Sequence, residues 1–519
     1  MQPRGVKLAM EKYLRIATHR ATIAGAAIFA QLGALILMIV RFSGYLPLFY
    51  AFCTGLSAVV VILIATGRSK SAYKISWIIL ILLFPIFGGL FYLMLGRTRL
   101  SAGMRRKMER TRLIGEKSLE TSQPILSELE GRDPRAAGQA RYIQNHAAYP
   151  LYRHQYSKFY PVGDLAFPDI LAELEKAERF IFLEFFIIEE GLMWNSILEI
   201  LRRKAQEGVD VRLIYDDLGC MFRLPKDYPA RLEAQGIKTE RFHPLTPLLT
   251  AKLNYRDHRK FIIIDGHTGL TGGINLADEY INVIERFGHW KDFAFLFKGE
   301  AVWSLTVMFL AMWEYLRGEQ ESLEDFRPPQ LSDLPPDQGF IQPFADNPLD
   351  DETVSETVYF NLINRAEEYL YIYTPYLVLD SEMVAAICAA AKTGVDVRLM
   401  TPGIPDKPLV FAVTRSYYQP LLESGVRIFE YTPGFMHGKA MVADDQVAVV
   451  GTVNLDYRSL YMAFENAVWL YHTESVLQIR DDFLETLKVC REVQLDHYRQ
   501  IPPLQRAKWA LLRLLAPLL

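Results

Sequence analysis

The chain has 519 residues, half of them apolar, and a formal net charge of −3. This length predicts more than one domain, and the nearly balanced charge argues against a chain-wide basic surface of the kind that binds nucleic acid. The four cysteines are widely separated and form no CxxC pair. Neither a disulfide framework nor a zinc site is therefore predicted.

Three apolar runs near the N-terminus predict a membrane module. They cover residues 21–40, 44–66 and 75–95, and each approaches the ~20 residues that a helix needs to cross the hydrocarbon core. We expect residues 1–110 to form transmembrane helices and residues 111–145 to form a linker. A cleaved signal peptide is the alternative, but the first run is long for one and two more runs follow it.

Basic residues around these runs predict how they cross the membrane. They precede the first run, recur over Arg68–Lys74 and follow the third run over Arg97–Lys107. The positive-inside rule places all three groups in the cytoplasm, which requires an even number of crossings. The third run contains Pro85, Gly88 and Gly89, which break helices. We therefore expect two spans and a third segment that enters and returns, with the rest of the chain in the cytoplasm.

From about residue 140 the sequence is typical of an α/β domain, and it repeats. GVDVRLI at 208–214 returns as GVDVRLM at 394–400, and β-rich and helical segments alternate around both copies. The spacing is too long for a solenoid and indicates a duplicated domain. We expect two halves, 146–326 and 346–498, joined by a Pro-rich linker at 327–345 and related by a pseudo-two-fold axis.

Two further segments have membrane-like composition. The C-terminal residues 499–519 combine Arg506, Lys508 and Arg513 with Trp509 and many leucines, which is typical of an interfacial helix. A helix that caps the core is the alternative. The apolar segment His243–Tyr255 is a candidate for a loop that touches the bilayer.

Each half also contains the same set of reactive side chains at the same offsets. The sets are His258, Lys260, Asp265 and Asn275, and His437, Lys439, Asp444 and Asn454. In each HxK the two side chains point to one face of a strand. Two such sets facing each other suit a phosphate diester, because one His can attack phosphorus while the other protonates the leaving oxygen.

Other carboxylates in these sequences have predicted supporting roles. Asp265 and Asp444 end buried strands, so we expect them to anchor local structure although they belong to the catalytic pattern. An imidazole nucleophile needs an acceptor for its far nitrogen. Glu465 is the candidate orienter of His437, and Asp292 that of His258; a surface salt bridge is the alternative for each. Glu184 is a third candidate, because a buried charge needs a partner.

The duplicated HxKxxxxDxxxxxxGxxN pattern resembles the phospholipase D superfamily. The segment WIILILLFPIFGGLFYLMLGR at 77–97 resembles the N-terminal module of bacterial cardiolipin synthases. The resemblance implies an α/β fold, with a duplicated α-β-α sandwich after the N-terminal helices, in a multi-pass protein of the inner membrane. It also implies that phosphatidylglycerol is the substrate.

The resemblance further implies a mechanism without metal or other cofactor, and the motif contains no metal-ligand set of usual spacing. In the mechanism that the resemblance implies, we expect His258 to attack phosphatidylglycerol and release glycerol, and a second phosphatidylglycerol to accept the phosphatidyl group. By the same resemblance we expect His437 to be the acid and then the base, and Lys260, Lys439, Asn275 and Asn454 to hold phosphoryl oxygens.

Three alternatives remain open. The first is a phospholipase D, or a synthase with another headgroup donor. The second is a nuclease, against which the net charge and the apolar runs argue. The third is a scaffold without activity, against which the two intact motifs argue.

Overall fold

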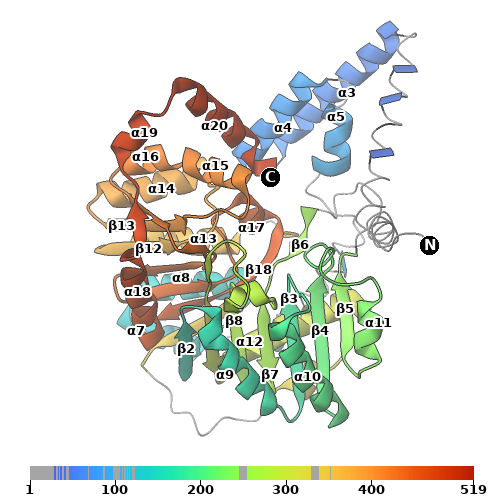
Figure 1. Cartoon of the computed structure of the whole chain (residues 1–519), viewed down its shortest axis with the longest axis vertical. Helices are drawn as coiled ribbons and strands as arrows, with labels where there is room; N and C mark the ends of the chain where they lie inside the picture. Colours follow the sequence, from blue (N-terminus) through green and yellow to red (C-terminus); the bar gives the residue numbers. More distant parts are fainter. Residues whose placement is uncertain are drawn as a thin grey trace, which may run out of the picture.

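The computed structural model describes residues 46–67, 69–85, 88–96, 123–244, 254–328, 338–350 and 352–518, with scattered positions at 29–41 and 106–119. Two α/β halves lie side by side, and the helices of residues 46–96 project from the second half (Figure 1). The apolar run 21–40 and the basic segment before it lie outside the described residues, apart from a few positions of the run. So do residues 245–253 of the candidate bilayer loop.

The first half forms a seven-stranded sheet in the order β2-β10-β8-β7-β3-β4-β5. Strands β3, β4 and β5 are parallel, and the other neighbours are antiparallel. The strands are β2 Tyr156–Tyr160, β3 Phe180–Phe185, β4 Asp210–Asp216, β5 Lys238–Phe242, β7 Phe261–Ile264, β8 Thr268–Gly272 and β10 Ala294–Lys298.

The second half repeats this order as β11-β18-β17-β16-β12-β13-β14, with β1 and β19 added at the edges. The predicted duplication is therefore confirmed strand by strand. The strands are β1 Tyr152–Arg153, β11 Phe340–Asp346, β12 Tyr369–Tyr373, β13 Asp396–Pro402, β14 Arg427–Tyr431, β16 Ala440–Ala443, β17 Val447–Gly451, β18 Ala463–Tyr471 and β19 Cys490–Glu492.

Helices divide the apolar side chains into three clusters. One lies between the first sheet and α9–α11, and another between the second sheet and its outer helices. The third is shared, because α12 and α18 fill the space between the two sheets. The helices are α9 Gly163–Glu175, α10 Leu192–Gln206, α11 Tyr228–Glu233, α12 Val302–Arg317, α13 Val354–Arg365, α14 Ser381–Lys392, α15 Pro408–Ser416, α16 Tyr418–Glu423, α17 Tyr457–Tyr461 and α18 Glu474–Leu487.

Two expected linkers contain regular structure. Residues 111–145 include α7 (Gln123–Arg132) and α8 (Pro134–Tyr142), whose apolar side chains join the outer core of the second half. The carboxylate of Asp133 accepts two backbone N–H groups at the start of α8 and so caps that helix. The expected linker 327–345 already contains the start of β11, which pairs with β18. The C-terminal boundaries predicted for the linkers 111–145 and 327–345 are therefore wrong, because helices lie within the first linker and a strand begins within the second.

The N-terminal segment forms a bent helical hairpin. Helix α3 (Leu46–Thr66) is followed by α4 (Ser71–Leu83), which ends before Pro85. The short helix α5 (Gly88–Phe91) and the π-helix Tyr92–Gly96 then return along α4, and the Tyr73 hydroxyl donates to the Gly96 carbonyl at 3.0 Å. The break that Pro85 predicts within run 75–95 is confirmed. In the described part of the chain, no helix combines the length and hydropathy required of a membrane span.

The C-terminal residues form α19 (Leu495–Arg499) and α20 (Pro503–Leu515). Helix α20 packs against α15 and α4, so it links the second half to the N-terminal hairpin. Its residues Leu504, Leu511 and Leu514 remain exposed. Helix α20 therefore covers part of the protein with one face and presents leucines with another.

Phe293→Ala should destabilise both halves together. Its buried ring contacts Phe159 of the first half and Tyr373 of the second, at centroid distances of 5.1 and 4.7 Å. Loss of a buried Phe ring costs about 3–5 kcal/mol. We expect one unfolding transition of the purified chain, at lower denaturant concentration. Phe222→Ala, at an exposed position, is the control. A loss confined to one of two separate transitions would contradict the shared core.

Candidate active site

The two motif histidines lie where the halves meet. The short strand β6 (Arg256–Asp257) pairs with the start of β18, and the His258 N–H donates to the Phe464 carbonyl at 2.9 Å. In the equivalent place, β15 (Gly434–Met436) pairs with β9 (His289–Lys291), and the His437 N–H donates to the Lys291 carbonyl at 2.7 Å. Each histidine backbone is therefore fixed by a strand of the opposite half.

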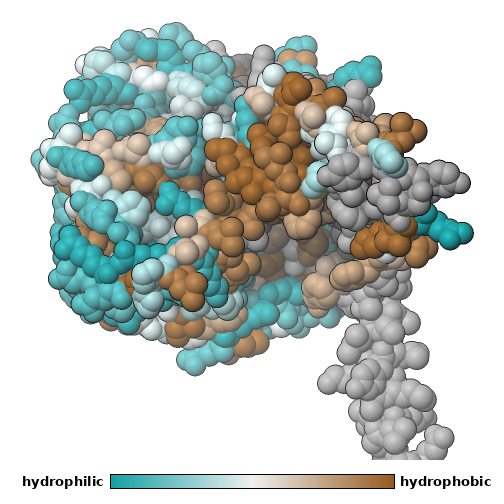
Figure 2. All heavy atoms as spheres, turned by 90° about the horizontal axis from the view of Figure 1, so that it is seen from above, coloured by the Kyte–Doolittle hydropathy of each residue, from teal (hydrophilic) through white to brown (hydrophobic). Residues whose placement is uncertain are grey.

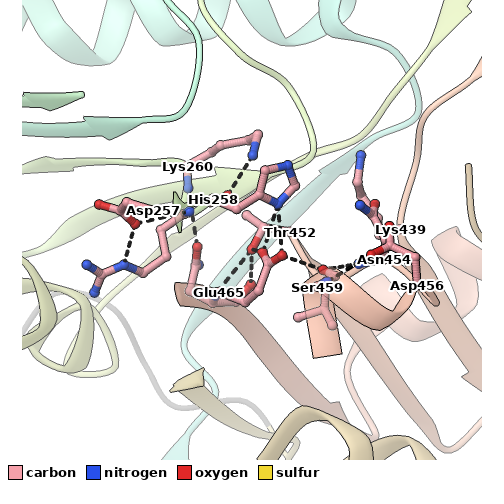
Figure 3. A network of polar contacts seen from close by, with 12 residues as sticks. Asp257, His258, Lys260, Lys439, Thr452, Asn454, Asp456, Ser459 and Glu465 are labelled. Carbon is pink, nitrogen blue, oxygen red and sulfur yellow. Dashed lines mark hydrogen bonds and ion pairs between the residues drawn. The ribbon is translucent and has the colours of Figure 1, made fainter. Parts of the chain in front are cut away.

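The imidazoles are paired with carboxylates in a crossed arrangement. His258 Nδ1 lies 2.9 and 3.0 Å from the two oxygens of Glu465 (Figure 3), and His437 Nδ1 lies 2.5 Å from Asp292 Oδ2. Both carboxylates orient a histidine, but the expected partners are exchanged, so the predicted pairing is wrong. The cause is the strand pairing between the halves. It places Phe464 opposite Asp257, and so brings the following residues, Glu465 and His258, next to each other.

These bonds determine which imidazole nitrogen is free. In the form of the site in which Glu465 and Asp292 are ionised, each carboxylate only accepts, so Nδ1 of each ring carries the proton and Nε2 presents a lone pair. Burial, together with the ammonium groups of Lys260 and Lys439, holds the pKa of both His258 and His437 well below the usual range. Both rings are therefore neutral near pH 7, which is the nucleophilic form.

Each HxK lysine folds back beside its histidine. Lys260 Nζ donates to the His258 carbonyl at 2.6 Å, and Lys439 donates to the His437 carbonyl. Burial lowers the pKa of Lys260 to about 7 and that of Lys439 to about 8. The cluster thus holds two amines that change charge near neutral pH, and the anion of a phosphodiester favours their protonated form.

The pKa values of the two carboxylates shift upward, whereas those of the two lysines shift downward. Burial raises the pKa of Asp292 to about 6 and that of Glu465 to about 8, against the lowering effect of the nearby lysines. Both side chains are fully buried. The lysines and hydrogen-bond donors around them offset this effect of burial only in part.

The aspartates of the motif tie strands together. Asp265 accepts the backbone N–H groups of Glu178, Arg179 and Phe180 at 2.7–2.8 Å, and so joins the turn after β7 to the start of β3. Asp444 accepts the equivalent three groups of residues 367–369. This is the anchoring role that the sequence predicts for the two aspartates. The backbone N–H groups occupy their carboxylate oxygens, which are then not available to a substrate.

The two motif asparagines differ in availability. Asn275 accepts from the Ile187 N–H at 2.9 Å and donates to the Tyr280 hydroxyl at 2.7 Å. Asn454 is also buried, but its Oδ1 has no hydrogen-bond partner within the described residues. Protein hydrogen bonds therefore hold both ends of the Asn275 amide, whereas the Asn454 Oδ1 is not held in this way.

Two hydroxyl groups complete the Glu465 side of the site. Thr452 and Ser459 both donate to the Glu465 carboxylate (Figure 3). In the first half Gly273 takes the place of Thr452, and a Cβ there would lie 2.0 Å from Asp292 Oδ1. The sequence indicates that Thr452 differs from its counterpart, because the second motif has Gly-Thr where the first has Gly-Gly. It contains no comparable signal for Ser459, whose counterpart is Tyr280.

Glu184 does not orient an imidazole. Its carboxylate lies 2.5 Å from Arg259 Nη2, and the same guanidinium donates to Asp257 at 3.0 Å. The prediction that this buried charge requires a partner is confirmed, and the partner is Arg259.

Comparison with known proteins gives consistent matches. The family model described as "Cardiolipin synthase, PLD-like domain" matches residues 170–285 and 359–487, and a phospholipase D-nuclease N-terminal model matches 55–97. An uncharacterized protein of Streptococcus mutans is 42% identical over 459 residues, which are 88% of this chain and 99% of that protein. A cardiolipin synthase of Geobacillus kaustophilus is 36% identical over 462 residues, covering 89% and 91% of the two chains.

A solved structure supports the same fold. The phosphatidylserine synthase of Haemophilus influenzae superimposes with a TM-score of 0.56 at 16% identity, covering 73% of this chain and 99% of that chain. The similarity supports the α/β architecture.

Anion binding at this site should weaken as pH rises. Lys260, with a pKa of about 7, and Lys439, with one of about 8, lose positive charge over this range, and Glu465 gains negative charge at about pH 8. Dimethyl phosphate stays a monoanion, so its affinity, measured by calorimetry from pH 6 to 9, reports the protein groups. We expect a fall centred between pH 7 and 8.

Lys260→Met should lower the affinity at pH 6 and make the dependence shallower. Lys238→Met, at a lysine that pairs with Asp210 in a different part of the first half, is the control. An affinity that stays constant from pH 6 to 9 would contradict the assignment.

Proposed function

Because the chain belongs to the cardiolipin synthase family of the phospholipase D superfamily, we propose that it joins two phosphatidylglycerol molecules into cardiolipin and releases glycerol. One observation carries the proposal. Two neutral imidazoles, each held through Nδ1 by a carboxylate of the opposite half, lie beside two lysines of the same buried cluster. This arrangement suits a double displacement at phosphorus.

In the first step, His258 Nε2 attacks the phosphorus of phosphatidylglycerol, and the bond from phosphorus to the glycerol oxygen breaks. The negative charge of the bound phosphate raises the pKa of His437, which takes up a proton at Nε2 and passes it to the leaving oxygen. The lysines stabilise the charge that develops on the phosphoryl oxygens. The choice of nucleophile rests on family resemblance and agrees with exposures of 15% for the His258 side chain and 9% for that of His437.

In the second step, His437 is neutral and acts as a base. It removes the proton from the terminal hydroxyl of a second phosphatidylglycerol, and that oxygen attacks phosphorus while the bond to His258 breaks. The product is cardiolipin, and His258 returns to its starting state. Water in place of the second lipid would give phosphatidic acid, which is the outcome of a phospholipase D.

We also propose that the protein is attached to a bacterial inner membrane, through run 21–40 and the α3–α4 hairpin. Exposed apolar side chains support this proposal, and Figure 2 shows an apolar area on the face that carries the hairpin. Helix α20 adds exposed leucines together with Arg506 and Lys508, a combination suited to the headgroup region. The exposed large apolar residues of the hairpin are Leu48, Phe52, Val59, Ile62, Leu63, Ile75, Leu82, Leu83 and Phe84.

The purified chain should convert phosphatidylglycerol alone into cardiolipin and glycerol, read by mass spectrometry. His258→Ala should abolish the product and any lipid adduct on the protein. His437→Ala should still form an adduct with a donor whose leaving group is activated, because such a group leaves without the acid.

The products distinguish the alternatives. Phosphatidic acid alone would indicate a hydrolase, and a requirement for phosphatidylethanolamine would indicate another donor. An adduct on His437 would reverse the two histidine roles.

Reporter fusions should place Lys70 and the C-terminus on the same, cytoplasmic side. The reason is the returning path of residues 71–96 together with the basic residues that flank it. A reporter active only in the cytoplasm is fused near Lys70 and after Leu519. If the two positions report opposite sides, residues 71–96 cross the membrane and the returning arrangement is wrong.

A further inference from the structure

The short helix α17 separates the N-terminal hairpin from the active site. It follows Asn454 of the second motif and precedes Glu465 on β18. In a helix, Tyr457 and Tyr461 share one face, and Ser459 points to the opposite face. The tyrosines contact the hairpin, and Ser459 contacts the Glu465 carboxylate. One turn of helix therefore touches both parts of the molecule.

Lys70 is the charged contact on the hairpin side. It lies in the turn between α3 and α4, with its Nζ 2.6 Å from Glu356 Oε1 and 3.4 Å from Asp380 Oδ2. The Tyr461 hydroxyl lies 2.6 Å from the same Glu356 oxygen and 2.9 Å from the same Asp380 oxygen. Glu356 and Asp380 are both buried, so Lys70 is the ammonium group that balances two carboxylates around Tyr461.

Tyr73 is the apolar contact on the same side. Its ring stacks on Tyr457 with a centroid distance of 5.8 Å and an interplanar angle of 7°. Tyr457 in turn contacts Tyr461, with centroids 4.5 Å apart. Both tyrosines of α17 are thus fixed by the first turn of α4 and the residue before it.

The opposite face of α17 reaches the nucleophile in two contacts. The Ser459 hydroxyl donates to Glu465 Oε1 and accepts the Asn454 backbone N–H at 2.9 Å. Glu465 accepts from His258 Nδ1. Figure 3 shows Ser459 between Asn454 and Glu465. A shift of α17 would therefore change both the orientation of the imidazole and the position of the Asn454 amide.

We propose that Lys70 is a positioning residue for the transfer reaction, which acts through Tyr461, Ser459 and Glu465 on His258. The N-terminal hairpin is then part of the catalytic apparatus as well as an anchor. The inference rests on the proposed function where it is tested by kcat. Its test by hydrogen exchange does not depend on activity.

Lys70→Met in the full chain, assayed in mixed micelles of detergent and phosphatidylglycerol, tests the proposal. We expect kcat to fall about tenfold, the size of effect that one well-placed hydrogen bond has, while KM changes less than about twofold. Lys70→Arg should restore most of the activity. Lys74→Met is the matched control, because Lys74 lies one turn further along, on α4, and its ammonium group donates to the Ala65 carbonyl. A wild-type kcat in Lys70→Met overturns the proposal.

A double-mutant cycle with Ser459→Ala tests the route. If Lys70 acts through Ser459, the double variant should be about as slow as Ser459→Ala alone. Losses that multiply would mean that Lys70 acts by another path and would overturn the proposal.

Hydrogen exchange provides the readout that does not need turnover. Amides of residues 457–466 should exchange faster in Lys70→Met than in Lys74→Met. Unchanged exchange overturns the inference even if the wild type is active. A wild type that makes no cardiolipin overturns only the proposed function.

Discussion

The hydrogen bond between an imidazole and a carboxylate of the other half is the interaction on which the site depends. Asp292 and Glu465 are fully buried, and an unpaired charge in such a place is strongly destabilising. Neither half supplies the imidazole partner of its own carboxylate, because each histidine comes from the opposite half. The pairings β6–β18 and β9–β15 and the core shared by α12 and α18 all serve to bring these partners together. Folding of the two halves and assembly of the site are therefore the same event.

The two copies of the motif have diverged around this common bond. In the first half a glycine leaves room for Asp292, and a tyrosine occupies the position of Ser459. In the second half the longer Glu465 receives two hydroxyl groups and the imidazole. The duplication thus gives two histidines with similar backbones and different electrostatic surroundings. Such a difference allows one ring to serve as nucleophile and the other to exchange protons, although the sequences around them are alike.

Local patterns in the sequence were sufficient to predict the repeated strands, the HxK pairs and the anchoring aspartates, because each depends on residues close in the chain. The partner of His258 depends on the pairing of segments 207 residues apart, for which the chain order suggested the wrong half. The helices α7 and α8 were assigned to a linker because several of their buried residues are alanines. Alanine is only weakly hydrophobic, so the helical spacing of apolar residues is hard to recognise in the sequence. Ser459 was missed because its counterpart in the first half is a tyrosine with another partner.

The placement of α7 and α8 has a consequence for synthesis on the ribosome. These helices pack on the second half, although the whole first half follows them in the chain. Arg135 of α8, for example, pairs with Glu367, 232 residues later. At 5–20 residues per second, about 10–50 s pass before that partner is made. During this interval the apolar face of α7 and α8 has no native surface to cover it. The apolar face of these two helices therefore lacks its native partner on the nascent chain until the second sheet has been made.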